Sequence, residues 1–286
     1  MDKTISDIQT EIRRQLAPIY PKREVLQIIF ILLEQFGVSQ VQAIAYPDAK
    51  ISQTDYEKLQ LQLKRLANGE PIQYVIGYEW FMGLKFIVNA DVLIPRPETA
   101  ELVQLIINQN NTNSPKILDI GTGSGCIAIA LKKMIENAEV TAIDISEKAI
   151  KVAQKNADLN DTNVNFLCKS VFADNLQFTP ASFDIIVSNP PYITESEKLQ
   201  MRANVLDFEP HIALFVPNGN PLLFYKQIAE YAQIWLKNGG ELYFEINERF
   251  GSETAQMLDN LSFSDIKTHK DFYQKDRMIS ALWNAK

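Results

Sequence analysis

The sequence "LDIGTGSGCIAIAL", Leu118–Leu131, passes from a short apolar segment through three glycines into a second apolar segment. The first segment is typical of a buried strand, and the second is typical of a helix. Glycine accepts positive φ values and lets a ligand approach the backbone closely. The spacing is G-x-G-x-G, which differs from dinucleotide-binding loops, and the lysine of a phosphate-binding loop is absent. The stretch therefore predicts a strand, a ligand-binding turn and a helix.

Strand and helix patterns alternate on both sides of this turn. Alternation of this kind predicts an α/β fold with a mostly parallel, doubly wound sheet and helices on both faces. Ligands bind such sheets at the carboxyl ends of the strands. The expected strands are "KILDI" (116–120), "VTAID" (140–144), "VNFLC" (164–168), "FDIIVS" (183–188), "ELYFEI" (241–246) and "RMISALW" (277–283), and the expected helices are 126–135, 146–160 and 221–236.

The N-terminal part of the chain has a different pattern. Segments 23–37 and 52–69 carry apolar residues at helical spacing and end in glycine, and Ser52 and Thr54 are candidate N-caps for the second. "WFMGLKFIV" (80–88) is aromatic and β-branched and is split by Gly83, which favours a hairpin. We expect three parts: a helical domain over 1–78, a β-hairpin linker over 79–95, and a sheet domain over 96–286.

Composition limits the classes of function. The chain has 286 residues and a net charge of -7, and tight binding to nucleic acid phosphates usually needs a basic face. The most apolar run, 25–36, is interrupted by charge and is too short to span a bilayer. The N-terminus lacks the core of a signal peptide. We therefore expect a cytoplasmic protein, with no membrane and no direct nucleic acid partner.

Cysteine and histidine are too few and too scattered for a metal site. Cys126 and Cys168 lie in apolar segments at no metal-binding spacing, and we interpret both as small core residues in a reducing compartment. His211 and His269 are far apart in the sequence. We expect no metal ion.

Asp144 ends the strand after the glycine turn, about 20 residues on. A carboxylate there suits hydrogen bonds from ribose hydroxyls. The alternative is that the glycines form a tight turn and Asp144 caps a helix.

The pattern D-x-G-x-G-x-G with a later acidic residue resembles S-adenosyl-L-methionine-dependent methyltransferases. The resemblance implies that the loop holds the methionine end and that apolar residues after the third strand flank adenine. The implied cofactor residues are Gly121, Thr122, Gly123, Ser124, Gly125, Asp144, Val171, Phe172 and Asn189.

The sequence "SNPPY", Ser188–Tyr192, stands at the carboxyl end of a predicted strand. Two prolines stiffen the chain and remove two backbone donors. A planar amino group conjugated to a π system, as in adenine or a glutamine amide, is a poor nucleophile because its lone pair is delocalised, so an enzyme that methylates it must orient it. Asn189 offers a side-chain carbonyl, Pro190 a rigid backbone carbonyl, and Tyr192 a flat face for stacking. Catalysis would rest on positioning and electrostatics. The alternative is that the prolines end the strand and Tyr192 fills the core.

Further motifs narrow the resemblance. "PIQYVIG" (71–77), "FMGLKFIV" (81–88), "LIPRPET" (93–99) and "FEPHIAL" (208–214) occur in order with the two motifs above, and together they resemble the HemK/PrmC family of release factor glutamine methyltransferases. The family implies N5-methylation of the glutamine in the Gly-Gly-Gln loop of class 1 peptide chain release factors. It implies that the helical domain and hairpin grip the release factor, and we expect a monomer. The implied catalytic residues are Asn189, Pro190 and Tyr192, and the implied substrate-binding residues are these together with Pro191.

Three other functions are weighed against this one. A glutamine methyltransferase acting on a ribosomal large-subunit protein would carry the same motif. A DNA adenine methyltransferase would need base flipping and a basic recognition domain, and neither is apparent. A binding module without activity would not need the two oriented hydrogen-bond acceptors of the Asn-Pro-Pro-Tyr motif, the carbonyls of Asn189 and Pro190. Arg96, Glu98 and Thr99 belong to a family motif near the site, but each has an equally simple structural interpretation.

Overall fold

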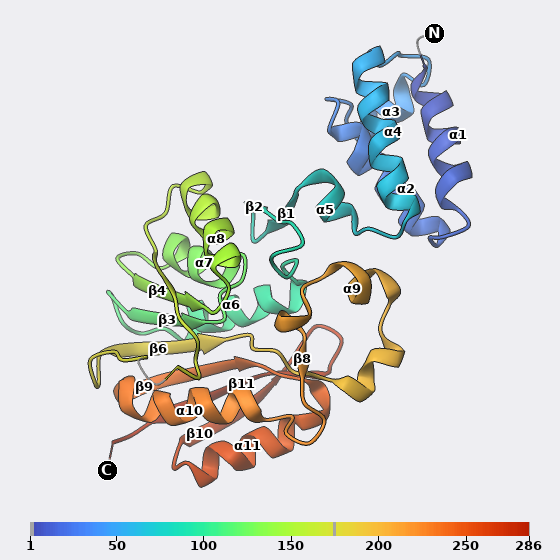
Figure 1. Ribbon diagram of the computed structural model, residues 1–286. Helices are drawn as coiled ribbons and strands as arrows, with labels where there is room; N and C mark the ends of the chain where they lie inside the picture. The colour runs from blue at the N-terminus through green and yellow to red at the C-terminus, as the bar shows by residue number, and fades with distance from the viewer. Residues whose placement is uncertain (1–2, 174–175, 286) are drawn as a thin grey trace. The chain divides into compact units, whose positions relative to one another are not determined.

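The computed structural model describes residues 3–173 and 176–285 and contains two compact units (Figure 1). The first, here called the helical unit, comprises Met1–Gly77 and Arg202–Phe208. The second, the sheet unit, comprises Tyr78–Met201 and Glu209–Lys286. No helix within these described ranges is long and apolar enough to cross a membrane.

Amphipathic helices build the helical unit around one apolar core. In the first helix, Ile8, Ile12 and Leu16 recur at helical spacing and are fully buried. Thr4 caps this helix by accepting a hydrogen bond from the backbone of Asp7, whose side chain bonds back. The helices are α1 (Ile5–Leu16), α2 (Lys22–Glu34), α3 (Gln40–Ala45), α4 (Gln53–Ala67), α5 (Ile72–Ile76) and α9 (Ala203–Phe208). Of the two candidate caps for α4, Ser52 accepts the capping hydrogen bond.

The sheet unit alternates strands and helices. Its strands are β1 (Tyr78–Phe81), β2 (Leu84–Ile87), β3 (Lys116–Ile120), β4 (Glu139–Asp144), β5 (Asn165–Cys168), β6 (Phe183–Ser188), β7 (Ile193–Thr194), β8 (Phe215–Val216), β9 (Leu236–Glu245), β10 (Ser264–Lys270) and β11 (Asp276–Trp283). Its α-helices are α6 (Pro97–Gln109), α7 (Cys126–Met134), α8 (Glu147–Leu159), α10 (Leu223–Trp235) and α11 (Gly251–Asn260). Its 3-10 helices are η1 (Glu195–Gln200), η2 (His211–Ala213) and η3 (Glu248–Phe250).

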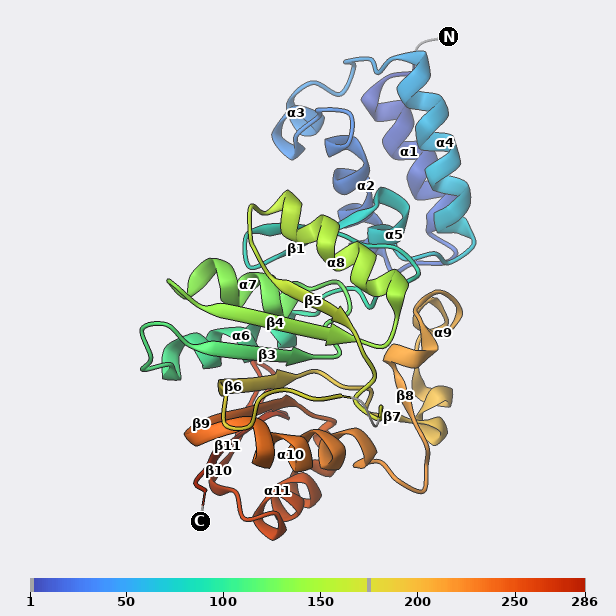
Figure 2. The ribbon, with the colours of Figure 1, turned by 60° about the vertical axis from the view of Figure 1, so that its left-hand side comes forward.

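Seven strands form the central sheet in the order β10-β11-β9-β6-β3-β4-β5. Figure 2 shows β5, β4, β3 and β6 side by side. Neighbouring strands from β5 to β9 are parallel, and β11 runs antiparallel to both β9 and β10. This is the predicted mostly parallel, doubly wound sheet, so the fold-class prediction is confirmed. The small hairpin β1–β2 and the pair β7–β8 form two further sheets.

Helices cover both faces of the sheet, and each face has its own core. Side chains of α6, α7 and α8 pack with Ile117, Ile185 and Val187 on one face. Side chains of α10 and α11 pack with Leu118 and Ile186 on the other. Successive strand residues point to opposite faces, which explains this division. Each fully buried aliphatic side chain stabilises the fold by about 1.5–3 kcal/mol.

The buried amide of Asn156 on α8 ties the hairpin to the glycine loop. Its Oδ1 accepts from the backbone N–H of Ile87 at 2.6 Å, and its Nδ2 donates to the carbonyl of Ile87 at 3.0 Å. The same Nδ2 donates to the carbonyl of Ser124 at 2.9 Å. One side chain therefore satisfies three backbone groups in two segments that are distant in sequence.

The two cysteines differ from each other. Cys126 is buried at the start of α7, as predicted. Cys168 is exposed, so its interpretation as a core residue is wrong. Cys168 ends β5, one of the two edge strands of the sheet, where an apolar sequence does not guarantee that both faces are covered.

Candidate functional site

The order of the strands defines where the site lies. The chain runs outward from β3 through β4 to β5 and then returns to β6, on the other side of β3. This reversal between β3 and β6 is a topological switch point, where ligands bind in open α/β sheets. Ile120 and Ser188 are paired across the two strands, and the Ser188 hydroxyl donates to the Ile120 carbonyl at 2.6 Å. The glycine loop and Asn189 therefore leave the sheet side by side.

The three glycines of the loop do two different jobs. Gly121 and Gly123 have φ values of 76° and 54°, and a Cβ at either would meet no atom within 4 Å. Their backbones therefore border open space, as a closely approaching ligand requires. A Cβ at Gly125 would lie 3.0 Å from Ile129 Cδ1 and 3.1 Å from Ala153 Cβ. Gly125 thus permits the close packing of α7 against α8.

Asp144 faces the glycine loop from the end of β4. Its Oδ2 accepts from the backbone N–H of Gly123 at 2.9 Å, and its Oδ1 accepts from that of Ser146 at 2.8 Å. Burial raises the pKa of Asp144, and the backbone hydrogen bonds from Ser146 and Gly123 oppose this effect. Each carboxylate oxygen keeps a second lone pair for a ligand hydroxyl.

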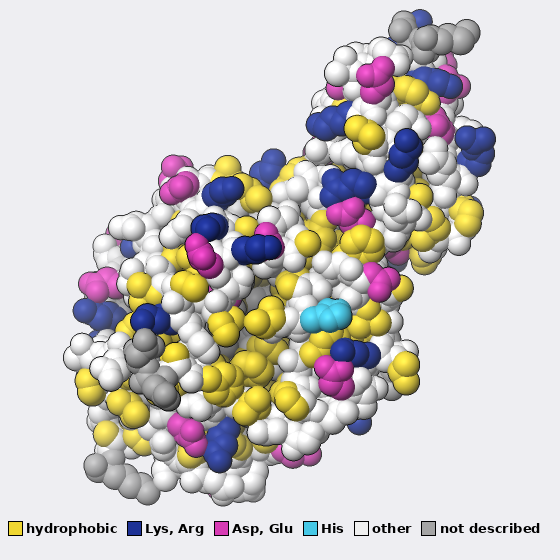
Figure 3. Space-filling view, viewed as in Figure 1, with side chains coloured by type: hydrophobic (Ala, Val, Ile, Leu, Met, Phe, Trp, Pro, Cys, Tyr) yellow, Lys and Arg dark blue, Asp and Glu magenta, His cyan; other side chains and the backbone are white. Residues whose placement is uncertain are grey.

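A cavity of about 280 Å³ opens at these strand ends. On the face seen in Figure 3, hydrophobic side chains gather around a recess in the sheet unit. Phe172 on the rim packs edge-on against Phe224, with ring centroids 5.2 Å apart. The lining residues are Asp91, Val92, Leu93, Ile120, Gly121, Gly123, Ile143, Asp144, Ile145, Ser146, Ala149, Lys169, Ser170, Val171, Phe172, Ser188, Asn189, Pro190, Pro191, Pro210, Ile212, Ala213, Phe224 and Ile228.

Most residues predicted for the site meet in this cavity. From the cofactor set, Gly121, Gly123, Asp144, Val171, Phe172 and Asn189 line it, and from the substrate set Asn189, Pro190 and Pro191 do. Thr122 and Ser124 belong to the same loop, but their side chains are buried and they do not line the cavity, and neither does Gly125. Tyr192 is also outside that set, and its hydroxyl donates to Glu245 Oε1 at 3.1 Å.

Residues from distant parts of the sequence complete the site. Thr99, on the first turn of α6, accepts a hydrogen bond from Asn189 Nδ2 at 3.2 Å. Arg96 forms an ion pair with Glu209, whose side chain is almost fully buried and precedes the cavity residue Pro210. Sequence reasoning had no role for Glu209 or Glu245, because only the fold brings them to Arg96 and Thr99.

Comparisons with known proteins show which family the chain belongs to. The family model for the PrmC N-terminal domain matches residues 7–77, and that for the methyltransferase small domain matches residues 99–207. A release factor glutamine methyltransferase of Bacteroides thetaiotaomicron is 47% identical, with 96% of this chain and 98% of the relative covered. One of Flavobacterium psychrophilum is 44% identical over the same shares. The chain belongs to the release factor glutamine methyltransferase family. The resemblance stated from its motifs is confirmed.

The fold of this release factor glutamine methyltransferase family member recurs in distant methyltransferases. A crystal structure of a methyltransferase from Pyrococcus furiosus superposes with a TM-score of 0.53, at 17% identity, covering 82% of this chain and all of the other. At this identity the likeness shows the Rossmann-like sheet alone. It agrees with the strand order above.

Asp119, which precedes the glycine loop of this family member, gives stability a pH dependence. Burial raises the pKa of this carboxyl from 3.8 to about 7, against a hydrogen bond from Thr122. Between these values the folded chain holds a proton that the unfolded chain releases, so stability falls as pH rises towards 7. From pH 5 to pH 8 we expect this group to remove about 2–3 kcal/mol.

The variant Asp119→Asn tests this dependence. Asparagine keeps an acceptor for the Thr122 hydroxyl but does not titrate. Urea unfolding of both proteins at several pH values should show the variant gaining stability relative to wild type between pH 5 and pH 8. Parallel pH profiles would contradict the assignment.

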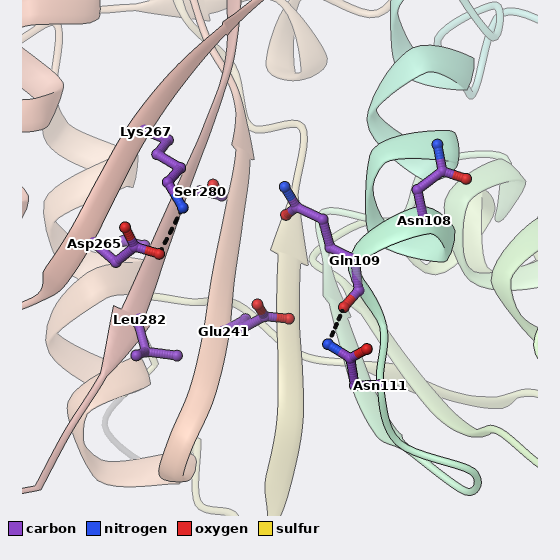
Figure 4. Close-up of a pocket in the computed structure, with 9 residues that line it drawn as sticks. Asn108, Gln109, Asn111, Glu241, Asp265, Lys267, Ser280 and Leu282 are labelled. Carbon is purple, nitrogen blue, oxygen red and sulfur yellow. Dashed lines mark hydrogen bonds and ion pairs between the residues drawn. The ribbon is translucent and has the colours of Figure 1, made fainter.

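A second cavity of the sheet unit, of about 260 Å³, lies between the C-terminal end of α6 and strands β9, β10 and β11 (Figure 4). It is lined by Asn108, Gln109, Asn111, Glu241, Asp265, Lys267, Ser280, Ala281 and Leu282. Lys267 pairs with Asp265 at 2.7 Å, and Glu241 accepts from the Tyr243 hydroxyl at 2.9 Å. Each of its three charged side chains therefore has a partner, and no residue of the switch point lines it.

Proposed function

We propose that the chain transfers a methyl group from S-adenosyl-L-methionine to the side-chain amide nitrogen (N5) of the glutamine in the Gly-Gly-Gln loop of class 1 peptide chain release factors. The observation that carries this proposal is the single cavity that joins Gly121, Gly123 and Asp144 to Asn189 and Pro190. Methyl transfer to an amide needs the two reactants held next to each other, and this cavity has a nucleoside-binding half and an amide-binding half on adjacent strands. The choice of a release factor as the substrate is supported by the names of the two relatives, both release factor glutamine methyltransferases.

The residues of the cavity fit the cofactor. Gly121 and Gly123 leave open space against the backbone, where the methionine end would lie. Asp144 offers lone pairs to ribose hydroxyls, and Val171 and Phe172 offer apolar walls to adenine. When bound, the cofactor supplies an activated methyl group on a sulfonium.

The Asn-Pro-Pro-Tyr segment would hold the glutamine. Asn189 Oδ1 and the Pro190 carbonyl would accept the two N–H bonds of the substrate amide and orient its nitrogen towards the cofactor. Pro191 keeps the segment rigid. The Tyr192 hydroxyl donates to buried Glu245, which holds the tyrosine ring in place. Asn189 would contact both the cofactor and the substrate.

The helical unit and the hairpin β1–β2 would bind the body of the release factor. The short helix α3 supports this role, because Val41, Ile44 and Tyr46 expose 74%, 67% and 65% of their surface. Apolar side chains gathered at a protein surface often mark a binding site for another protein. We propose that the protein acts as a monomer in the cytoplasm, where release factors work.

Mass spectrometry of the organism's own release factors tests the function. We would incubate them with this protein and S-adenosyl-L-methionine and measure intact and peptide masses. The expected result is one added methyl group on the glutamine of the Gly-Gly-Gln loop. No added methyl, with cofactor binding intact, would reject the release factor, and ribosomal large-subunit proteins and then DNA would be tested in the same assay.

The variant Asp144→Ala tests the cofactor site. Loss of a charged hydrogen-bond acceptor should raise the dissociation constant of S-adenosyl-L-methionine about tenfold or more in calorimetry. Glu147→Gln is the matched control, because it removes a negative charge from the exposed first turn of α8, next to the site. An unchanged constant for Asp144→Ala would remove Asp144 from the ribose role.

A further inference from the structure

A buried carboxylate stands behind the Asn-Pro-Pro-Tyr segment. Glu245 ends β9, the strand beside β6, and exposes 1% of its surface. Its Oε2 accepts from the Thr99 hydroxyl at 2.6 Å, and its Oε1 accepts from the Tyr192 hydroxyl at 3.1 Å. Burial raises the pKa of Glu245, while these two hydrogen bonds and the charge of Arg277 lower it.

The hydrogen bonds from Glu245 to Asn189 have a direction. A hydroxyl has a single hydrogen, and Thr99 donates its hydrogen to Glu245. Thr99 Oγ1 can therefore offer only lone pairs to Asn189, and it accepts from Asn189 Nδ2 at 3.2 Å. Because Thr99 holds the NH₂ group of Asn189, the opposite edge of the planar amide presents Oδ1.

We propose that Thr99 and Glu245 are positioning residues that fix the amide orientation of Asn189, so that Oδ1 is the atom offered to the methyl acceptor. The proposal rests on the proposed function, since it assumes that the group receiving the methyl is an amide that donates N–H hydrogen bonds. An amide rotated by half a turn would present NH₂ to the substrate NH₂, and two donors cannot form a hydrogen bond. The orientation of Asn189 therefore decides whether a bound glutamine is held or repelled.

The chemical identity of each residue suits this role. Glu245 accepts from both the Thr99 and the Tyr192 hydroxyls, so its carboxyl group fixes which way the Thr99 hydroxyl points. A glutamine in place of Glu245 could donate to Thr99 and so permit the reverse direction. Thr99 exposes only 2% of its surface, so water does not compete for its hydroxyl. Thr99 on α6, Asn189 directly after β6 and Glu245 on β9 thus form one oriented chain of hydrogen bonds.

Kinetics of matched variants test the proposal. Thr99→Val removes the hydroxyl and keeps the shape, and Thr99→Ser keeps the hydroxyl. We expect Thr99→Val and Glu245→Gln to lower kcat about 10- to 100-fold on release factor, with the cofactor dissociation constant within twofold of wild type. Thr99→Ser should keep kcat within about threefold.

Thr254→Val is the control, because Thr254 is also buried and donates to the Phe250 carbonyl at 2.7 Å, away from the site. A folded Thr99→Val with wild-type kcat would overturn the proposal.

A measurement without turnover separates this proposal from the proposed function. In protein with isotope-labelled asparagine and threonine methyl groups, a nuclear Overhauser effect should connect the Asn189 NH₂ protons to the Thr99 methyl group. Its absence, with both signals assigned, would overturn the orientation even if methyl transfer is normal. A wild-type protein that shows the effect but methylates no release factor would instead reject the proposed substrate.

Discussion

Replacing Asn189 by alanine should lower kcat for release factor methylation by a factor of 100 or more, corresponding to about 3 kcal/mol of transition-state stabilisation. The variant loses the side-chain carbonyl that orients the amide nitrogen, while the rigid Pro190 carbonyl remains. Thr99 would lose a hydrogen-bond donor but would still reach Glu245. Single-turnover kinetics with saturating cofactor would measure the loss at the chemical step.

Binding of S-adenosyl-L-methionine to Asn189→Ala should weaken much less than the chemical step. Gly121, Gly123 and Asp144 line the cofactor half of the cavity and are unchanged in the variant. Calorimetry on the same preparation provides this comparison. Near wild-type turnover would eliminate the amide-orientation mechanism, and equal losses in binding and turnover would make Asn189 a cofactor ligand only.

Replacing Asn156 by alanine should lower the free energy of unfolding by about 3 kcal/mol. The substitution leaves the N–H and C=O groups of Ile87 and the carbonyl of Ser124 without their partner. Asn156 is fully buried, so water cannot replace the lost hydrogen bonds without opening the packing of α8. Urea unfolding followed by circular dichroism would measure the change.

The control for Asn156→Ala is Gln104→Ala, on the exposed side of α6. Gln104 bonds only to the neighbouring side chain of Asn108 among the hydrogen bonds described for it, and its loss should change stability by less than about 0.5 kcal/mol. If the two variants unfold alike, the hairpin and the glycine loop are not joined through Asn156 in solution.

The local parts of the site were predictable from sequence, because their signals lie within a few residues. The glycine loop and Asn189–Pro191 each follow a strand with a plain apolar pattern, and Asp144 ends such a strand. Parallel strands bring their carboxyl ends to one edge of a sheet, so these residues had to meet. The resemblance implied a cofactor role for Gly125 along with the rest of the loop, whereas the surroundings of Gly125 show a packing role.

The rest depended on contacts across the chain. Thr99 and Glu245 are 146 residues apart, and no local pattern couples them. The strand β10, "SDIKTHK", was missed because it is polar and lies at the edge of the sheet, where burial imposes no apolar pattern. Tyr192 was expected to offer its ring to the substrate, but nothing in the sequence revealed Glu245 as the partner of its hydroxyl.

The pairing of Ile120 with Ser188 fixes the distance between the starting points of the cofactor loop and the substrate loop. Neighbouring strands are held about 4.8 Å apart by their hydrogen bonds. The two loops that leave these residues therefore start from a spacing that side-chain changes around the cavity do not alter. A designer could rebuild the rim to accept a different amide-bearing protein while the separation between donor and acceptor loops remains set by the backbone.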